Sequence, residues 1–429
     1  MIAAIRRRSA RLWRSGSLRQ SALGFTLQIA GKALAMLVVL MLTRALDPAD
    51  YGRFAYARSW VFLAGPLATL GLGYAAHRFV PGYLARGDYA LATGYVLLAA
   101  GVAAAMALPA MAGLALVTGA MALGVLPVAL MVTLRPPMQA LGLAGLSFAP
   151  LLTLAPLLQA LGLAGLAAAD ALTYSAAIAV FLSALFVAAL VQVGGLALAW
   201  VRRAGVDRPQ LKPRAWFGVA GPLTVSSLAM VIYQQADLLV VGATRPAEEA
   251  ALYSLGLALA LLLSVVATSV SAVYVPRLAR AVDSGDTDAL QQLARQSALA
   301  YALPVAAGLA GFAVLGPAIL PMFGAFYSQA FAVLMLLGAA ELVLALSEPA
   351  GQMLNLTGRH RHNAALVCCG AAINLVLTLI LVPRFGFVAA AAVTLGVASL
   401  WSLARLLLLR RCCGLWVGIA ATVRSHVQP

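Results

Sequence analysis

Three ionisable side chains stand inside long apolar stretches of this sequence, where a charge is costly unless it faces a cavity or a partner. Lys32 lies near the centre of the first stretch, Asp237 in the last turns of the seventh, and Glu341 near the middle of the tenth. A buried ammonium group can bind an anion in a cavity, or it can pair with a carboxylate of another helix. Both interpretations stay open for Lys32. A buried carboxylate can hold a coupling proton or sodium ion, which we favour for Glu341, or it can accept hydrogen bonds between helices, which we favour for Asp237.

The sequence contains no arrangement of residues that is typical of catalysis. Its four histidines lie at the ends of apolar runs or in loops, away from any pattern that indicates nucleophilic chemistry or metal ligation. The cysteines form two adjacent pairs, which is not the spacing of a zinc site. Gly71-Leu72-Gly73 begins a pattern seen in dinucleotide-binding turns, but such a turn follows a strand, so we interpret these glycines as sites of close helix packing. We expect no enzyme activity, no metal site and no cofactor, apart from possible coupling to a Na⁺ or H⁺ gradient.

Composition indicates that the surrounding solvent is lipid. Hydrophobic residues make up 63% of the chain, charged residues 10%, and the mean hydropathy is +0.97. A water-soluble domain usually has about a quarter of its residues charged. The net charge of +16 does not indicate nucleic-acid binding, because the basic residues gather at the ends of apolar runs and form no face. We therefore predict an all-α integral membrane protein.

The apolar runs predict about twelve transmembrane helices, each close to the roughly 20 residues that span a bilayer. The division between the third run (90–110) and the fourth (112–134) is the least distinct. With the N-terminus placed in the cytoplasm, 23 of the 29 Lys and Arg residues fall on that side and five on the other. Cytoplasmic loops of membrane proteins carry such an excess of basic residues. The charge distribution therefore supports an even number of spans, with both termini cytoplasmic.

A repeated segment indicates that the chain consists of two related halves. Pro48 matches Pro246, and Pro81 matches Pro276, at nearly equal separations and with similar turns and apolar runs around them. The predicted organisation is a basic cytoplasmic or interfacial segment at 1–20, an N-terminal six-helix lobe at 21–200, a cytoplasmic linker at 201–214, a C-terminal six-helix lobe at 215–410 and a cytoplasmic tail at 411–429.

Three stretches carry a resemblance to a known family. The segment LTRALDPADYGRF at 42–54 and the segment LVPRFGFVAAA at 381–391 resemble the polysaccharide transporter family. These proteins are the O-antigen and exopolysaccharide repeat-unit flippases of the multidrug/oligosaccharidyl-lipid/polysaccharide (MOP) superfamily. The segment DLLVVG at 237–242 is similar to span seven of the same family.

The resemblance implies two six-helix lobes in a V-shaped, MATE-like architecture and a location in the bacterial inner membrane. It further implies movement of undecaprenyl-pyrophosphate-linked oligosaccharide from the cytoplasmic to the periplasmic leaflet by alternating access, without covalent chemistry. A polysaccharide polymerase and glycosyltransferases are the expected partners. By position, Lys32, Arg44 and Arg58 would meet the pyrophosphate, Gln234 and Gln235 would contact sugar, and Asp237 or Glu341 would couple an ion gradient.

Two alternatives to a flippase fit part of the sequence. A MATE-type, cation-coupled multidrug antiporter is favoured by the acidic residues in the spans and disfavoured by Lys32. A membrane glycosyltransferase or polymerase would need a large external loop, whereas the predicted external loops do not exceed about fifteen residues.

Overall fold

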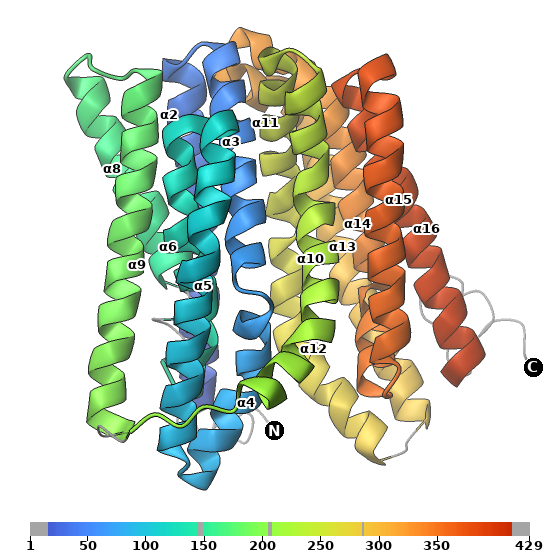
Figure 1. Ribbon diagram of the computed structural model, residues 1–429. Helices are drawn as coiled ribbons and strands as arrows, with labels where there is room; N and C mark the ends of the chain where they lie inside the picture. The colour runs from blue at the N-terminus through green and yellow to red at the C-terminus, as the bar shows by residue number, and fades with distance from the viewer. Residues whose placement is uncertain (1–15, 144–146, 148, 205–207, 285–286, 414–429) are drawn as a thin grey trace, which may run out of the picture. The chain divides into compact units, whose positions relative to one another are not determined.

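The structure of this chain, a computed structural model, consists of helices (Figure 1). It describes residues 16–143, 147, 149–204, 208–284 and 287–413, so the predicted segments 1–20 and 411–429 lie largely outside the described residues. The described residues form no strand, and the predicted all-α fold is confirmed. In chain order the helices are α2 (Gly16–Ala45), α3 (Pro48–Ala68), α4 (Leu72–Arg86), α5 (Tyr89–Thr118), η1 (Gly119–Gly124), α6 (Val125–Ala140), η2 (Pro150–Leu154), α8 (Ala155–Ala168), α9 (Tyr174–Ala204), α10 (Pro213–Thr244), α11 (Ala247–Leu263), α12 (Val265–Ser284), α13 (Thr287–Ile319), η3 (Leu320–Phe323), η4 (Ala325–Ala330), α14 (Phe331–Leu356), α15 (His360–Phe385) and α16 (Phe387–Cys413).

Within the described residues, nine helices are long and apolar enough to cross a membrane, or ten if the bent pair α3 and α4 counts as one span. One of the nine stretches, Tyr89–Ala140, is 52 residues long and therefore has the length of two crossings. It contains the predicted third and fourth spans. The chain is thus a multi-pass membrane protein.

The boundary predicted between those two spans, near residue 111, was wrong. Helix α5 continues to Thr118, whose hydroxyl donates to the carbonyl oxygen of Leu114 at 3.0 Å. The next residue, Gly119, has φ of +57°, a conformation that side-chain-bearing residues rarely adopt. The chain therefore leaves the helix at the glycine, and α6 begins after the short helix η1.

The repeated segment appears in the structure as a pair of broken helices. Pro48 begins α3, and Pro246 is the N-cap of α11. In the first copy the helix breaks between Ala68 and Leu72 with a bend of 45°, and in the second it breaks at Ser264. Pro81 and Pro276 each lie inside the helix after the break. The two copies therefore share one local architecture.

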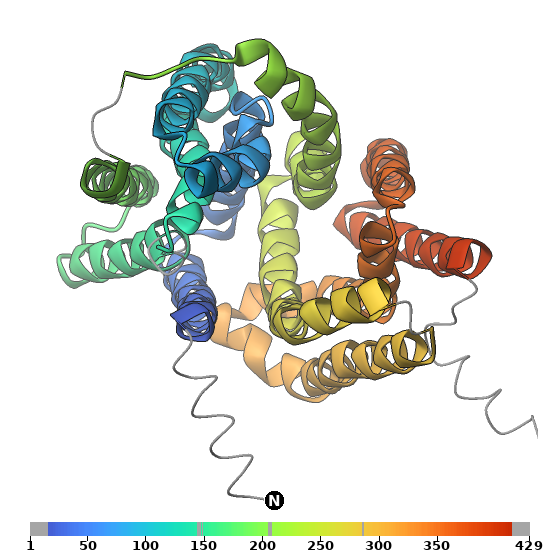
Figure 2. The same ribbon diagram turned by 90° about the horizontal axis from the view of Figure 1, so that it is seen from below.

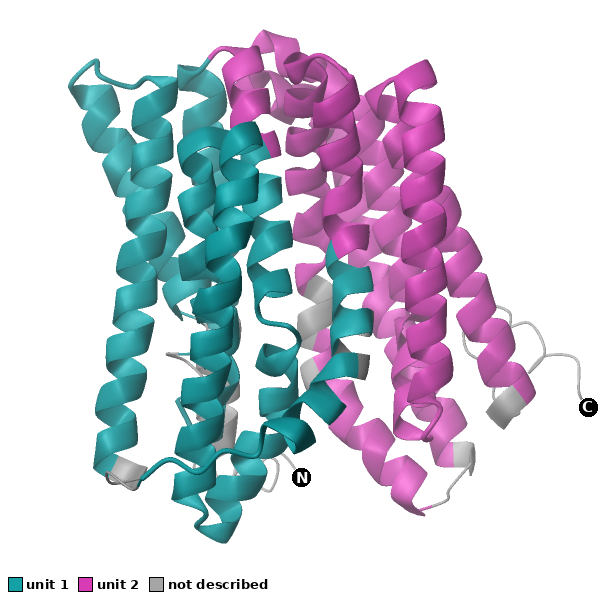
Figure 3. Ribbon diagram, viewed as in Figure 1, with its two compact units in different colours: residues 1–46, 57–231 teal, residues 47–56, 232–429 magenta. Residues whose placement is uncertain are grey.

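The chain forms two compact units (Figure 3). Unit 1 contains residues 1–46 and 57–231, and unit 2 contains residues 47–56 and 232–429. The boundary falls inside α10, and the first turns of α3 group with unit 2. The division into two lobes of six spans stays a prediction, because the two units are defined by their internal contacts and not by the number of spans in each.

In unit 1, α6 packs against α4, α5 and α9, and the predicted linker is attached to the same body. The backbone N–H of Gln210 donates to the carbonyl oxygen of Ala90 at 3.0 Å. Trp216, near the start of α10, is fully buried and donates to the hydroxyl of Tyr83 at 2.9 Å, with its ring 5.1 Å from that of Tyr95. Aromatic pairs at this distance add to the stability that burial provides. The start of α10 is therefore part of the core of unit 1.

In unit 2, α14 is the central helix and packs against α11, α13 and α16 (Figures 1 and 2). The first turns of α3 join this body through Tyr51 and Gly52. The Tyr51 hydroxyl lies 3.3 Å from Ser254 Oγ, and its ring stands edge-on to that of Tyr327. A Cβ atom on Gly52 would lie only 1.7 Å from the carbonyl oxygen of Ala247. Glycine at position 52 therefore lets α3 and α11 touch backbone to backbone.

Replacing Gly52 with alanine is expected to destabilise the protein, because the added methyl group overlaps a backbone atom that cannot rotate away. Overpacking of this kind costs about 1–3 kcal/mol. Gly101→Ala is the matched control, since a Cβ there meets nothing within 4 Å, and alanine should stabilise that helix by up to about 1 kcal/mol. The thermal midpoints of the two variants in one detergent measure the difference. Equal midpoints would contradict the close contact at Gly52.

Candidate functional site

The break between α3 and α4 turns one face of α4 into the wall of a cavity. Thr69 donates to the carbonyl oxygen of Pro66 at 2.8 Å, and Leu70 and Gly71 have φ of +46° and +70°. A Cβ atom on Gly71 would lie 2.1 Å from Thr224 Oγ1 of α10, so the predicted close helix packing at this glycine is confirmed. Helix α4 therefore begins in a new direction.

The second wall is α6, which continues through two adjacent prolines. Pro136 and Pro137 have no N–H, so the carbonyl oxygens four residues earlier, at Val132 and Thr133, lose their helical donors. In a membrane such groups persist where they face protein or a water-filled cavity. Val132 lines the cavity. Arg135, directly before the prolines, projects from the same stretch of helix.

The third wall is an irregular segment with α9 beside it. The π-helix η2 approaches α2 so closely that a Cβ atom on Gly31 would lie 1.7 Å from the carbonyl oxygen of Leu152. Thr153 Oγ1 fixes the same contact by donating to the carbonyl oxygen of Leu27 at 2.9 Å. On α9, Gln192 is 1% exposed and its Nε2 donates to the carbonyl oxygen of Met131 at 2.9 Å. Isolated π-helical turns frequently occur at functional sites.

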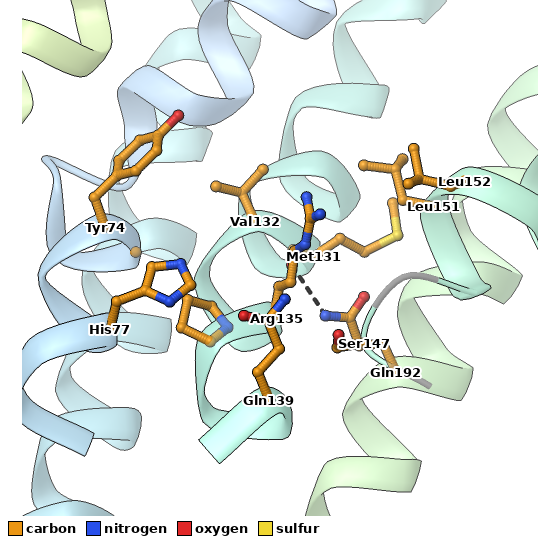
Figure 4. Close-up of a pocket in the computed structure, with 12 residues that line it drawn as sticks. Tyr74, His77, Met131, Val132, Arg135, Gln139, Ser147, Leu151, Leu152 and Gln192 are labelled. Carbon is orange, nitrogen blue, oxygen red and sulfur yellow. Dashed lines mark hydrogen bonds between the residues drawn. The ribbon is translucent and has the colours of Figure 1, made fainter. Parts of the chain in front are cut away.

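These three walls enclose what we call the unit 1 cavity, with a volume of about 430 Å³. Figure 4 shows Tyr74 and His77 on the α4 side, Arg135 and Gln139 on α6, and Gln192 opposite. The full lining is Gly73, Tyr74, His77, Met131, Val132, Arg135, Pro136, Gln139, Ser147, Leu151, Leu152 and Gln192. A guanidinium group suits phosphate, and amide and hydroxyl groups suit sugar hydroxyls. The volume lies within the range of small-molecule sites.

Unit 2 contains a buried carboxylate that receives three hydroxyl groups, which we call the Asp237 cluster. Asp237 is 5% exposed and accepts from Tyr253 Oη at 2.9 Å, from Thr378 Oγ1 at 3.1 Å and from Thr394 Oγ1. Asn374 Nδ2 donates to Thr394 Oγ1 at 3.4 Å. Within the described residues, the buried Asn374 Oδ1 has no hydrogen-bond partner. Four helices, α10, α11, α15 and α16, thus contribute to one oxygen-rich group.

The comparison with protein families matches residues 17–282, well over half of the chain, to the model described as "Polysaccharide biosynthesis protein". The chain belongs to this family. The comparison with curated protein sequences found no match to this chain.

Solved structures similar to this chain include MATE transporters. An inward-facing multidrug resistance MATE family transporter of the MOP superfamily has a TM-score of 0.73 and 12% identity, covering 92% of this chain and 99% of the other. The outward-facing conformation of such a transporter gives 0.63 and 13%, covering 92% and 95%. A mutant of a Vibrio cholerae MATE transporter gives 0.57 and 14%, covering 92% and 98%. At these identities the likeness shows the fold, which is MATE-like.

The cations predicted to bind substrate in this polysaccharide biosynthesis protein all belong to unit 1. Lys32 is half-buried on α2, Arg44 is exposed in the last turn of that helix, and Arg58 is exposed on α3 with its guanidinium 5.6 Å from the ring of Phe62. The lining of the unit 1 cavity contains Arg135 instead. The roles of the three predicted cations stay predictions.

Sequence reasoning missed Arg135 because the fourth span was predicted to end at residue 134 and Arg135 was counted among the cytoplasmic basic residues. The structure continues α6 to Ala140, which places Arg135 within the helix. Gln192 carried a signal that was available, since it is an amide near the middle of an apolar run. That signal was missed because the only amides considered within the spans were Gln234 and Gln235, which precede an ionisable residue.

The predicted polar residues of unit 2 lie on two of its helices. Gln234 is exposed and Gln235 is half-buried on α10, one turn before Asp237. Glu341 is half-buried on α14. The sequence favoured Asp237 as a carboxylate that accepts hydrogen bonds between helices, and its three hydroxyl partners on other helices agree with this. A role for Asp237 or Glu341 in ion coupling stays a prediction. The described residues contain no group of three or more His, Cys, Asp or Glu side chains placed to hold a metal ion.

A second cluster of polar side chains in unit 2 surrounds an ion pair between Arg405 and Glu348. Arg405 is 8% exposed within α16 and lies 3.6 Å from Glu348. Arg405 Nε donates to Asn363 Oδ1 at 3.2 Å. Gln352 Nε2 donates to Glu348 Oε1 at 3.3 Å and to Tyr301 Oη at 2.8 Å. These side-chain contacts link α13, α14, α15 and α16.

Proposed function

We propose that this polysaccharide biosynthesis protein translocates an oligosaccharide linked to undecaprenyl pyrophosphate from the cytoplasmic to the periplasmic leaflet of the bacterial inner membrane. The O-antigen or exopolysaccharide repeat unit is the proposed cargo, and transport proceeds by alternating access without covalent chemistry. The observation that carries this proposal is the unit 1 cavity, where one guanidinium group stands among amide and hydroxyl groups. The family membership supports it as well.

The chemistry of the cavity matches the two parts of such a substrate. In the proposal, Arg135 holds a phosphate of the diphosphate, because a guanidinium group can give two parallel hydrogen bonds to phosphate oxygens. Gln139 and Ser147 bind sugar hydroxyls, which both donate and accept. Lys32, Arg44 and Arg58 remain candidates for further diphosphate contacts, and Gln234 and Gln235 for sugar contacts, as the sequence predicts.

Energy for transport comes, in this proposal, from a Na⁺ or H⁺ gradient that acts at Asp237. The cluster offers a carboxylate, hydroxyl oxygens and the amide oxygen of Asn374, which are the oxygen ligands that hard cations prefer. A proton on the carboxylate is the alternative occupant, because a neutral acid is less costly to bury than a charged one. Glu341 is a second candidate for the same role.

Deletion of the gene tests the proposed function. The deletion strain is expected to lose full-length surface polysaccharide and to accumulate the lipid-linked repeat unit, because the polymerase and its partners act after translocation. Expression of the wild-type chain should restore both. Purified protein in vesicles should also move a fluorescent polyprenyl-diphosphate oligosaccharide to the leaflet where a membrane-impermeant reagent destroys its signal. A deletion strain with normal surface polysaccharide and no accumulated intermediate would overturn the proposal.

A cation-coupled multidrug antiporter is the second candidate, favoured by the similarity of the fold to multidrug MATE transporters and by the buried Asp237. It predicts that a strain overexpressing the protein tolerates higher concentrations of cationic drugs, whereas the flippase predicts no change. Drug susceptibility of overexpressing and deletion strains, measured together with surface polysaccharide, distinguishes the two functions.

A further inference from the structure

Unit 2 carries an apolar groove between α15 and α16, which we call the α15–α16 groove. Its volume is about 550 Å³. The lining residues are Leu377, Leu381, Phe385, Ala389, Ala392, Val393, Gly396, Val397 and Leu400. No charged side chain is among them. Phe385 and Leu400, at its two ends, are 71% and 60% exposed, so the groove faces the surroundings of the protein.

The groove is open because α16 presents small side chains along it. Ala389, Ala392 and Gly396 follow one another at intervals of three and four residues, which places them on one helical face. A Cβ atom on Gly396 would meet nothing within 4 Å. Glycine costs a helix about 1 kcal/mol relative to alanine. The missing side chain at position 396 is therefore not required by protein packing, and it leaves room for an external group.

The length of the groove fits one leaflet of the bilayer. From Ala389 to Leu400 the helix rises by about 16 Å, at roughly 1.5 Å per residue. One leaflet contributes about half of the roughly 30 Å hydrocarbon core. The groove begins next to the turn at Gly386, which is a membrane-interface position. An acyl chain of a phospholipid has this length, whereas a polyisoprenoid chain would extend far beyond the groove.

A cation stands at the interfacial end of the groove. Arg384 is exposed in the last turn of α15, beside Phe385. The neighbouring Arg245 is engaged within the protein, because its Nη2 lies 2.7 Å from Glu249 Oε1 and its Nη1 donates to the carbonyl oxygen of Pro383 at 3.5 Å. Glu249 also accepts from the backbone N–H of Phe387 at 3.1 Å, which fixes the turn. Arg384 is therefore placed to meet a lipid phosphate.

We propose that the α15–α16 groove binds one acyl chain of an anionic phospholipid, with its phosphate at Arg384. The lipid comes from the leaflet on the Arg245 and Arg384 side, which the sequence predicts to be periplasmic. A chain in this groove packs against the helices that carry Thr378 and Thr394, so it supports the frame of the Asp237 cluster. This site does not depend on the proposed function, because any bilayer supplies its ligand.

Photolabelling in vesicles tests the site. The full-length protein is reconstituted with a diazirine-bearing phosphatidylglycerol, irradiated and digested, and the labelled residues are identified by mass spectrometry. We expect label to concentrate on residues 377–400. Gly396→Leu should reduce this label by about tenfold, because the new side chain occupies the space of a few methylene groups. Gly101→Leu is the matched control, since position 101 is also exposed and open, and it should leave the label on 377–400 unchanged.

The headgroup and the identity of the chain are tested in the same vesicles. Phosphatidylglycerol should label the groove more strongly than phosphatidylcholine, and Arg384→Gln should remove that preference. Equal labelling by the two lipids in the wild type would overturn the contact at Arg384. Label spread evenly over the lipid-facing helices, or an equal loss in Gly396→Leu and Gly101→Leu, would overturn the groove itself. Displacement by a low concentration of polyprenyl diphosphate would overturn the choice of a phospholipid.

Discussion

Replacing Asp237 with asparagine is expected to abolish the dependence of transport on an ion gradient while leaving the protein folded. The asparagine side chain keeps the size of aspartate and one acceptor oxygen, so it can still accept from some of the three hydroxyl groups. It cannot take up a proton or neutralise a cation. Coupling between two sites corresponds to a change of roughly 5- to 150-fold, and we expect the transport rate under a gradient to fall by that factor. Flipping in vesicles with imposed Na⁺ or H⁺ gradients measures it.

Two further variants separate coupling from folding. Asp237→Ala removes the acceptor altogether and leaves buried hydroxyl groups unsatisfied, at a cost of about 1–3 kcal/mol each, so this variant should be unstable as well as inactive. Ser254→Ala removes a hydroxyl that contacts Tyr51 elsewhere in unit 2, and its gradient dependence should equal that of the wild type. If Asp237→Asn responded to both gradients as the wild type does, Asp237 would have no part in coupling.

Replacing Arg135 with alanine is expected to weaken binding of the diphosphate substrate. A hydrogen bond to a charged group contributes about 1.5–3 kcal/mol, which corresponds to a loss of roughly 10- to 150-fold in affinity. Arg135→Lys should recover part of this loss, because lysine restores the charge without the two-pronged geometry of the guanidinium group. Binding of a polyprenyl-diphosphate oligosaccharide to the purified protein gives the affinity, and vesicle assays give the transport rate.

Arg86→Ala is the matched control for Arg135, since it removes the same charge from the same unit. Arg86 pairs with Asp88 at the surface, where its side chain is 63% exposed, and exposed pairs contribute little to stability. This variant should bind substrate as the wild type does. If Arg86→Ala and Arg135→Ala lost affinity equally, a general effect of charge would explain both, and Arg135 would not be a specific contact.

The elements that the sequence predicted well are those with local causes. Pro48 and Pro246 mark helix starts in both copies of the repeat, because proline is compatible with the first turn and with the position before it. The length and apolar character of the runs predicted a membrane fold, and both can be read directly from the sequence. The glycine at position 71 was correctly interpreted as a close contact, although its positive φ could not be known from a pattern.

The candidate sites depend on contacts between distant parts of the chain, and one sequence does not contain that information. Asp237 receives hydroxyl groups from residues 16, 141 and 157 positions away, and threonine and tyrosine in an apolar run carry no sign of such a partner. The unit 1 cavity needs the break after Ala68, the continuation of α6 beyond Arg135 and the π-helix η2. The break and η2 depart from a regular helix, and α6 continues past the predicted end of its span, so a model of uniform spans could not predict their meeting.

The division of α3 and α10 between the two units bears on whether the chain could be cut into two halves. The first turns of α10, encoded after the midpoint of the chain, complete the core of unit 1 through Trp216. The first turns of α3, encoded in the first half, complete unit 2 through Tyr51 and Gly52. Neither half of the gene therefore encodes a complete body. Either half produced alone would leave core residues of a unit without the side chains that cover them.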